Sequence, residues 1–323
     1  MFSFAPAIPS RGDIDWCWFL RRQGSEGDAI ERILHDIGIM NPGGWADWVP
    51  STLTATGAPV EMQFSEATPG LSLLTEVGDP ASDLSSRVGR VCQIMTELGG
   101  TAPNAPLRDV ISAAQGAGAL RFGAWLGLRQ VGQHLHTRLL AELPADAIDL
   151  ASLLWSPEIG QAIHACSPRT RATMLAHDGT TGLSTIYFRA ERPDLAQLAA
   201  TAKVSDTVLT TALARLADIP GGTPLPLRQL GFSFAMHADG KRPMLTLHVD
   251  AAELCATDDQ IAERLTASCA LPMAGYASLL DALPAAPRGQ RHHRTISLTA
   301  RPCAAPTFSV GVAAPWSCPY AVQ

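Results

Sequence analysis

The feature that most constrains the fold is a pattern of paired strands that recurs five times along the 323 residues. In each copy, two segments of alternating apolar and polar residues flank a turn signal such as Pro69-Gly70, Asp178-Gly179 or Asp239-Gly240. Alternation on both sides of a turn is typical of a β-hairpin. The turn centres recur about every 50 to 65 residues, which is the length of a supersecondary unit. The five predicted hairpins cover residues 51–79, 121–144, 172–190, 231–250 and 293–314.

Helical segments, usually two of them, separate consecutive hairpins. Their apolar residues recur at spacings of three and four, which gives each helix one face to bury. The segment that follows Ser205 also opens with a Ser-Asp cap. The predicted helices cover residues 84–95, 107–114, 147–154, 157–166, 194–202, 205–216, 258–268 and 273–283. The sequence therefore predicts five ββαα units.

Ten antiparallel strands in one sheet tend to close, because closure removes the exposed edges. We predict an α+β fold in which residues 1–323 form a single domain, a ten-stranded antiparallel β-barrel with its helices on the outside. Side chains alone do not fill so wide a barrel, so its interior is expected to enclose a ligand. The alternative is a pair of stacked α+β domains without a common interior.

Composition excludes several classes of function. A net charge of −6 disfavours nucleic acid as a partner. The seven cysteines are scattered without a C-x-x-C pair, which disfavours a disulfide framework and a structural zinc site. The sequence contains no apolar run of membrane-spanning length, so we expect a cytoplasmic protein with no membrane partner. We find no Walker loop, G-x-S-x-G elbow or dinucleotide fingerprint, and no cofactor is expected.

Polar residues on the predicted strands form the candidate site. Glu61 either points into the barrel or makes a salt bridge at its rim. His134, His136 and Arg138 share one strand face because side chains alternate along a strand. That face is either solvated or able to bind an anion, and two histidines are only half of a zinc site.

Two further groups of residues carry weaker signals. Tyr187 and His248 hold equivalent positions in the third and fourth hairpins, which favours a shared orientation. The stretch His292-His293-Arg294 follows a segment rich in arginine and proline, and we interpret it as a basic surface loop.

The segment Ser51-x-Leu-Thr-x-x-Gly-x-Pro-Val-Glu61 resembles the first hairpin of dimethylallyltryptophan synthase-type aromatic prenyltransferases, and Leu271-Pro-Met-x-x-Tyr276 resembles their C-terminal portion. The resemblance implies the five-fold ββαα (ABBA) barrel and an enzyme of natural-product biosynthesis. Such enzymes transfer an allylic group from a prenyl diphosphate to an aromatic acceptor, usually an indole. By this resemblance Glu61 is the catalytic residue that binds the acceptor N–H, since charge-assisted hydrogen bonds are strong.

The second strand of each hairpin departs from the family's pattern of Lys, Arg and Tyr residues. Thr75 stands near the place of an expected Arg, and the third and fourth strands read Thr185-x-Tyr187 and Thr246-x-His248. Only three tyrosines and two lysines occur in the chain. What remains for a reduced diphosphate site is His136, Arg138, Tyr187 and His248.

These departures leave two other functions open. The first is a barrel of the same ancestry that has lost diphosphate chemistry and isomerises or cyclises a small molecule, with Glu61 and a histidine as acid and base. The second is a protein that binds a small molecule without catalysis.

Overall fold

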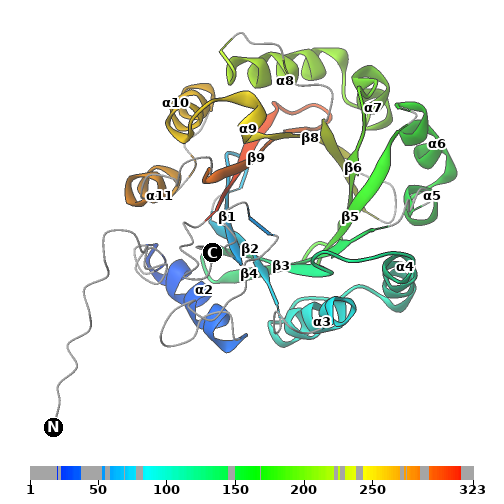
Figure 1. Ribbon diagram of the computed structural model, residues 1–323, viewed down its shortest axis with the longest axis vertical. Helices are drawn as coiled ribbons and strands as arrows, with labels where there is room; N and C mark the ends of the chain where they lie inside the picture. The colour runs from blue at the N-terminus through cyan, green and yellow to red at the C-terminus, as the bar shows by residue number, and fades with distance from the viewer. Residues whose placement is uncertain are drawn as a thin grey trace, which may run out of the picture.

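The computed structural model shows a closed barrel of ten strands, all paired in antiparallel fashion (Figure 1). The structure describes residues 20, 23–37, 53–54, 59–68, 70–77, 83–144, 150–167, 169–221, 225, 230–237, 243–269, 273, 275–283 and 291–313. The strands are β1 (Val60–Ser65), β2 (Leu71–Glu76), β3 (Ala124–Val131), β4 (His134–Glu142), β5 (Arg171–Asp178), β6 (Ser184–Arg189), β7 (Gly231–Met236), β8 (Met244–Asp250), β9 (His293–Ala300) and β10 (Thr307–Ala313).

The first and last strands of this set close the barrel. Strand β1 pairs with β2 on one side and with β10 on the other, where Glu61 lies opposite Ala313 and Ser65 lies opposite Ser309. All ten strands thus share one sheet, which confirms the predicted barrel and overturns the alternative of two stacked domains.

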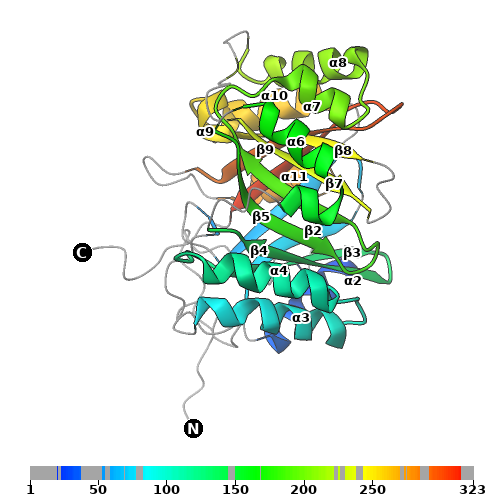
Figure 2. The same cartoon turned by 90° about the vertical axis from the view of Figure 1, so that its right-hand side faces the viewer.

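The helices surround the barrel, as Figures 1 and 2 show. They are α2 (Ser25–Asp36), the short 3-10 helix η1 (Leu84–Ser86), α3 (Arg87–Glu97), α4 (Ala105–Gly116), α5 (Leu150–Leu154), α6 (Pro157–Ala165), α7 (Leu195–Thr201), α8 (Asp206–Asp218), α9 (Ala251–Leu254), α10 (Asp258–Ser268) and α11 (Tyr276–Ala282). Side-chain caps fix several starts: Asn104 accepts a hydrogen bond from Leu107 N, and Ser205 accepts one from Val208 N. The predicted cap at Ser205 is therefore confirmed.

The main hydrophobic core lies between the sheet and the helices. Alternate residues of each strand point outward, such as Val60, Met62 and Phe64 of β1, and they are buried beneath the helical layer. The largest fully buried side chains, Phe232, Phe234 and Phe308, belong to this outer face as well. The opposite residues of the same strands, which are mostly polar or small, are left to face the interior.

Two helices were not predicted from the sequence. Helix α9 is a single turn directly after β8, too short to produce a periodic pattern. Helix α2 lies beside β2 and β3, where the Glu26 carboxylate accepts hydrogen bonds from Leu71 N and Gly132 N. Parts of the first predicted hairpin (51–79) lie outside the described residues, and within the described residues its strands are Val60–Ser65 and Leu71–Glu76.

Candidate active site

Contacts between non-adjacent strands identify the side chains that face the interior of the barrel. The Arg294 guanidinium on β9 lies 5.8 Å from the Trp125 ring on β3. Likewise, the Tyr187 ring on β6 lies 5.4 Å from the His248 ring on β8. Tyr187, His248 and Arg294 keep accessible surface although they point inward. The interior is therefore not completely filled by side chains.

Glu61 lies inside the barrel and not at its rim. Its side chain is only 5% exposed, and its Oε2 atom is 3.5 Å from Nη1 of Arg294. The amide of Gln63 donates a hydrogen bond of 3.4 Å to the other carboxylate oxygen. Burial raises the pKa of Glu61, while the positive charge of Arg294 opposes that rise. No hydrogen bond from the described residues reaches Oε2.

Gly311 makes room for this carboxylate. It lies on β10 opposite Gln63, and a Cβ atom at position 311 would come within 2.5 Å of Glu61 Oε1. Any larger residue would displace the acid.

The interpretation of residues 292–294 as a surface loop was wrong. His293 begins β9, and His292 and His293 are 3% and 2% exposed. The Asp258 carboxylate accepts hydrogen bonds from both backbone N–H groups, and its Oδ1 lies 2.5 Å from His293 Nδ1. Arg294 follows and points into the barrel. The charged composition of the preceding segment suggested exposure, whereas the Asp258 acceptor that buries these residues lies far away in sequence.

Trp125 provides an aromatic surface near Glu61 and Arg294. Its ring stacks on Phe122 with centroids 3.7 Å apart, within a second apolar cluster that includes Leu74, Leu140 and Ala176. No described residue hydrogen-bonds to Trp125 Nε1. This part of the interior therefore combines a carboxylate, a guanidinium and an indole ring.

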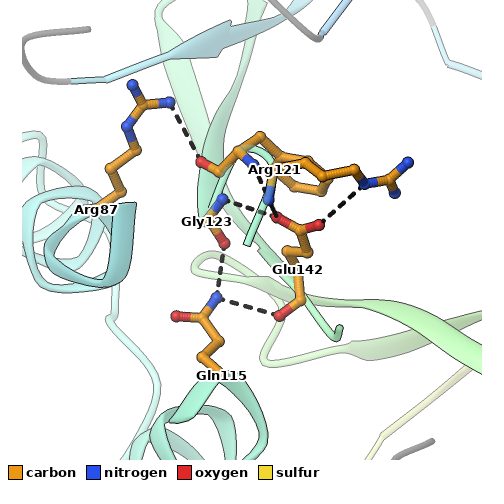
Figure 3. A network of polar contacts seen from close by, with 6 residues as sticks. Arg87, Gln115, Arg121, Gly123 and Glu142 are labelled. Carbon is orange, nitrogen blue, oxygen red and sulfur yellow. Dashed lines mark hydrogen bonds and ion pairs between the residues drawn. The ribbon is translucent and has the colours of Figure 1, made fainter. Parts of the chain in front are cut away.

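A buried network holds the segment that carries Phe122 (Figure 3). Glu142 Oε2 accepts hydrogen bonds from the backbone N–H groups of Arg121, Phe122 and Gly123, at 2.9, 2.8 and 3.0 Å. The Gln115 amide bridges the carbonyls of Gly123 and Glu142, and Arg87 donates to the carbonyl of Phe122. Because these buried groups satisfy one another, the aromatic pair has a fixed position.

A second charged group lies nearer to the hairpin turns. Arg138 Nη2 donates a 2.9 Å hydrogen bond to Thr185 Oγ1, and its guanidinium lies 5.9 Å from the Tyr187 ring. Arg129 pairs with His136 in the β3–β4 register. Among the described residues, Arg129 makes no hydrogen bond or ion pair through its side chain. Asp178 lies opposite Arg138.

The electrostatics of this group favour anions only partly. Burial and the nearby Arg129 lower the pKa of His136, so that histidine is neutral near pH 7. Burial acts to raise the pKa of Asp178, but hydrogen bonds from Thr181 and Thr180 and the charge of Arg138 lower it overall. Asp178 is therefore ionised, and its charge offsets one of the two arginines.

His248 acts through hydrogen bonds and not through charge. Its Nδ1 lies 2.7 Å from Ser297 Oγ and its Nε2 lies 2.9 Å from Ser233 Oγ. Burial, assisted by the charge of Arg138, lowers the pKa of His248 to about 4. The imidazole is neutral at physiological pH and joins two hydroxyl groups across three strands.

The strand register separates Arg129 and His136 from Trp125, whereas Arg138 lies in the same row of paired residues as Glu61, through Leu74 and Gly127. Residues Arg129, His136 and Asp178 lie near the hairpin turns, whereas Trp125 and Glu61 lie near the opposite ends of their strands. The structure thus brings together three of the predicted residues, Arg138, Tyr187 and His248. His136 shares the inward face of β4 with Arg138, and Glu61 stands apart.

Sequence reasoning missed Arg129, Trp125 and Arg294. Position 129 alternates correctly with Trp125, so strand periodicity alone carried a signal for both residues. Of the two lysines, Lys203 is exposed after α7, and Lys241 lies outside the described residues. Within the described ranges, no group of three His, Cys, Asp or Glu side chains is arranged to hold a metal, and no helix has the length and apolar character needed to cross a membrane.

Comparison with known proteins identifies the architecture. No protein-family model matches the sequence, and no curated protein matches it either. Solved structures do match. The 5-dimethylallyl tryptophan synthase from Streptomyces coelicolor, in complex with DMASPP and Trp, superposes with a TM-score of 0.73 at 16% identity and covers 97% of each chain. The chain has the dimethylallyltryptophan synthase fold.

Two further structures agree with this assignment. The 6-dimethylallyltryptophan synthase from Micromonospora olivasterospora, in complex with DMASPP and Trp, has a TM-score of 0.69 at 17% identity and covers 92% of this chain and 95% of its own. The prenyltransferase PriB, in ternary complex with L-tryptophan and dimethylallyl thiolodiphosphate, has a TM-score of 0.68 at 17% identity and covers 94% and 96%. The expected resemblance to ABBA-type prenyltransferases is confirmed at the level of the fold.

Proposed function

We propose that this protein is an aromatic prenyltransferase of natural-product biosynthesis that moves an allylic group from a prenyl diphosphate to an indole-type acceptor. The observation that carries the proposal is the division of the barrel interior into two chemically different halves. One part presents Arg129 near the β3–β4 turn and Arg138 in the middle of β4, and the other presents Glu61 with Arg294, whose guanidinium lies near Trp125. A reaction between an anionic donor and an aromatic acceptor needs both kinds of surface.

In this proposal the arginine half binds the diphosphate. Arginine is suited to phosphate because its guanidinium offers several N–H donors in a fixed plane. Arg129 and Arg138 each keep an Nε atom without a hydrogen bond in the described part of the chain, which supports binding of such a ligand. Tyr187 and neutral His248 would then line the path of the allylic cation, since electron-rich rings favour a nearby positive charge.

Binding of the donor tests this half of the proposal. Dimethylallyl thiolodiphosphate should bind the protein in a calorimetric titration, and Arg138→Gln should weaken binding about tenfold or more, because a charge-assisted hydrogen bond is lost. The control is Arg301→Gln, which removes an equal charge from an exposed position in the β9–β10 turn. No binding by the wild-type protein at millimolar ligand would exclude prenyl transfer.

In the other half, Glu61 accepts a hydrogen bond from the N–H group of the acceptor. Its Oε2 atom forms an ion pair with Arg294 but receives no hydrogen bond from the described residues, which supports this role, and a buried carboxylate stabilises positive charge that develops on an aromatic ring during attack. Glu61→Gln keeps the shape of the side chain and removes its charge. We expect prenylation of tryptophan or a related indole to fall by about a hundredfold, while the thiolodiphosphate binds normally. An unchanged rate would remove Glu61 from the mechanism.

One observation favours the second candidate, a barrel that no longer handles diphosphates. Asp178 offsets one arginine, and His136 and His248 contribute no positive charge near pH 7. Such a barrel would bind a small aromatic molecule and ignore the thiolodiphosphate. The titration described above therefore separates the two candidates.

We also propose that the protein acts in the cytoplasm without a cofactor. Five cysteines in the described residues are free thiols, which supports a reducing compartment.

A further inference from the structure

We infer that Arg171 and Arg189 form a binding site for a phosphate or diphosphate group at the end of the barrel opposite the hairpin turns. This site is separate from Arg129 and Arg138, the two arginines to which the proposed function assigns the prenyl donor. The inference therefore goes beyond that function, and it is tested without a prenyl donor.

The two arginines lie directly opposite each other on neighbouring strands. Arg171 begins β5, Arg189 ends β6, and the antiparallel register pairs them. Tyr187 faces the interior, so Arg189, two residues later, lies on the same inward face. Phe188, between them, is 4% exposed and stacks on Phe232 in the outer core. Both arginines thus belong to the inward face, and at the end of the barrel both remain exposed.

A β-bulge puts Arg171 on this face. Strict alternation along β5 from the inward-facing Asp178 would turn Arg171 outward. The β5–β6 register shifts between Ala172 and Met174, so Thr173 is an extra residue that reverses the alternation. Ala172 is accordingly buried in the outer core, at 3% exposure. Bulges of this kind re-aim a side chain and are common beside active sites.

The described part of the chain supplies no counter-ion to this pair. Neither Arg171 nor Arg189 makes a hydrogen bond or an ion pair through its side chain with the described residues. Arg169, two residues earlier, differs because it donates to both carboxylate oxygens of Glu191, at 3.1 and 2.9 Å. Like charges that face each other across two strands destabilise a sheet. A bound anion would remove the repulsion between Arg171 and Arg189.

A glycine leaves room beside the pair. Gly231 begins β7 and lies opposite Arg189 on one side and His248 on the other. A Cβ atom at position 231 would lie only 3.2 Å from the Cβ atom of His248. Because glycine has no side chain, nothing projects between Arg189 and His248 in this row, and a ligand held by the two arginines can extend into the barrel.

The chemistry of the pair favours a phosphate-type anion. Each guanidinium offers five N–H donors in a plane, and two of them together match an anion with two charges and several oxygens. Two sources share this chemistry. One is the diphosphate that the proposed reaction releases, and the other is a phosphate ester carried by the acceptor.

The test is a calorimetric titration with two probes, inorganic diphosphate and indoxyl phosphate. It is performed on Arg138→Gln, which weakens the proposed donor site and leaves the Arg171–Arg189 pair intact. We expect at least one probe to bind. Adding Arg171→Gln or Arg189→Gln should weaken that binding about tenfold or more, because charge-assisted hydrogen bonds are lost. Adding the exposed control Arg301→Gln should not.

Thermal unfolding without ligand shows whether the two arginines serve the fold instead. Arg171→Gln and Arg189→Gln should leave the thermal midpoint unchanged or raise it, because each relieves a repulsion between like charges. A lower midpoint in both variants would show a structural role and overturn the inference.

The titration has clear outcomes. Tighter binding of diphosphate would identify the released leaving group as the ligand, tighter binding of indoxyl phosphate would identify a phosphorylated acceptor, and both support the site. If neither probe binds at millimolar concentration, or if the affinity is the same without Arg171 and Arg189, the inference is wrong. Failure of the proposed function has a different signature, since prenylation would be absent while a probe still bound in a manner that depends on Arg171.

Discussion

Small residues decide where the charged side chains of the interior lie. Gly127, Gly231 and Gly311 all face inward, and a Cβ atom at each position would press on a neighbouring side chain. At Gly311 that neighbour is the catalytic candidate Glu61, at 2.5 Å. The position of the Glu61 carboxylate therefore depends on the lack of a side chain at Gly311 as well as on Arg294.

Gly311→Ala tests this dependence. Because the clashing atom is the end of a side chain that can rotate, we expect the thermal midpoint to change little. We expect Glu61 to move and tryptophan binding to weaken several-fold. The matched control is Gly116→Ala on α4, where a Cβ atom meets nothing within 4 Å. Wild-type tryptophan affinity in Gly311→Ala would show that the carboxylate does not need this space.

The orientation and charge of individual side chains were harder to predict from the sequence than the elements or the fold. The alternation of β3 and β4 placed Arg138 and His136 on one face, and the contacts of Arg138 with Thr185 and Tyr187 agree with that. Arg294 was misplaced because the β-bulge between β9 and β10 that turns it inward leaves no local signal, and because Asp258 approaches from a helix 35 positions earlier. The charge state of His248 also could not be predicted from the sequence. This histidine is neutral because it is buried, and its burial depends on the closed barrel.

At the scale of secondary-structure elements, Glu142 ties the end of β4 to the start of β3. One carboxylate oxygen accepts three backbone N–H groups, while Arg121 contributes an exposed ion pair to the other oxygen. Residues 121–123 precede β3, which begins at Ala124. Their backbone N–H groups therefore bind the Glu142 carboxylate.

Glu142→Gln should destabilise the protein by about 2–4 kcal/mol, because an amide NH₂ group would face buried N–H donors in place of an oxygen. Urea unfolding measures the change. Glu191→Gln, which removes an exposed pair with Arg169, should cost less than about 0.5 kcal/mol. A Glu142→Gln variant as stable as this control would contradict the role of the network.

Most elements follow from local pattern. Strand alternation and apolar spacing predicted all ten strands and both helices between most hairpins, because each element buries one face against the other layer. Strand ends were less certain, as in the second predicted hairpin, which was placed from residue 121 although β3 begins at Ala124. Pairing partners set such ends, and those partners come from distant parts of the chain.

At the scale of the whole molecule, closure was predictable from the number of hairpins. Five equivalent antiparallel units favour closure, because pairing of the two outer strands with each other removes both exposed edges. The separation of charge inside the barrel was not predictable in this way. It depends on which end of a strand carries the charged side chain, as on β3, where Arg129 lies near the turn and Trp125 near the opposite end.

The pairing of β1 with β10 also determines when the barrel can close during synthesis of the chain. The hydrogen bond from Phe308 N to Glu66 joins residues 242 positions apart. At typical rates of synthesis, β10 leaves the ribosome on the order of tens of seconds after β1. Throughout that interval the nascent sheet has an open edge, so the barrel can close only late in translation. Chaperones that shield strand edges should therefore raise the yield of this protein more than they raise that of a helical protein of equal length.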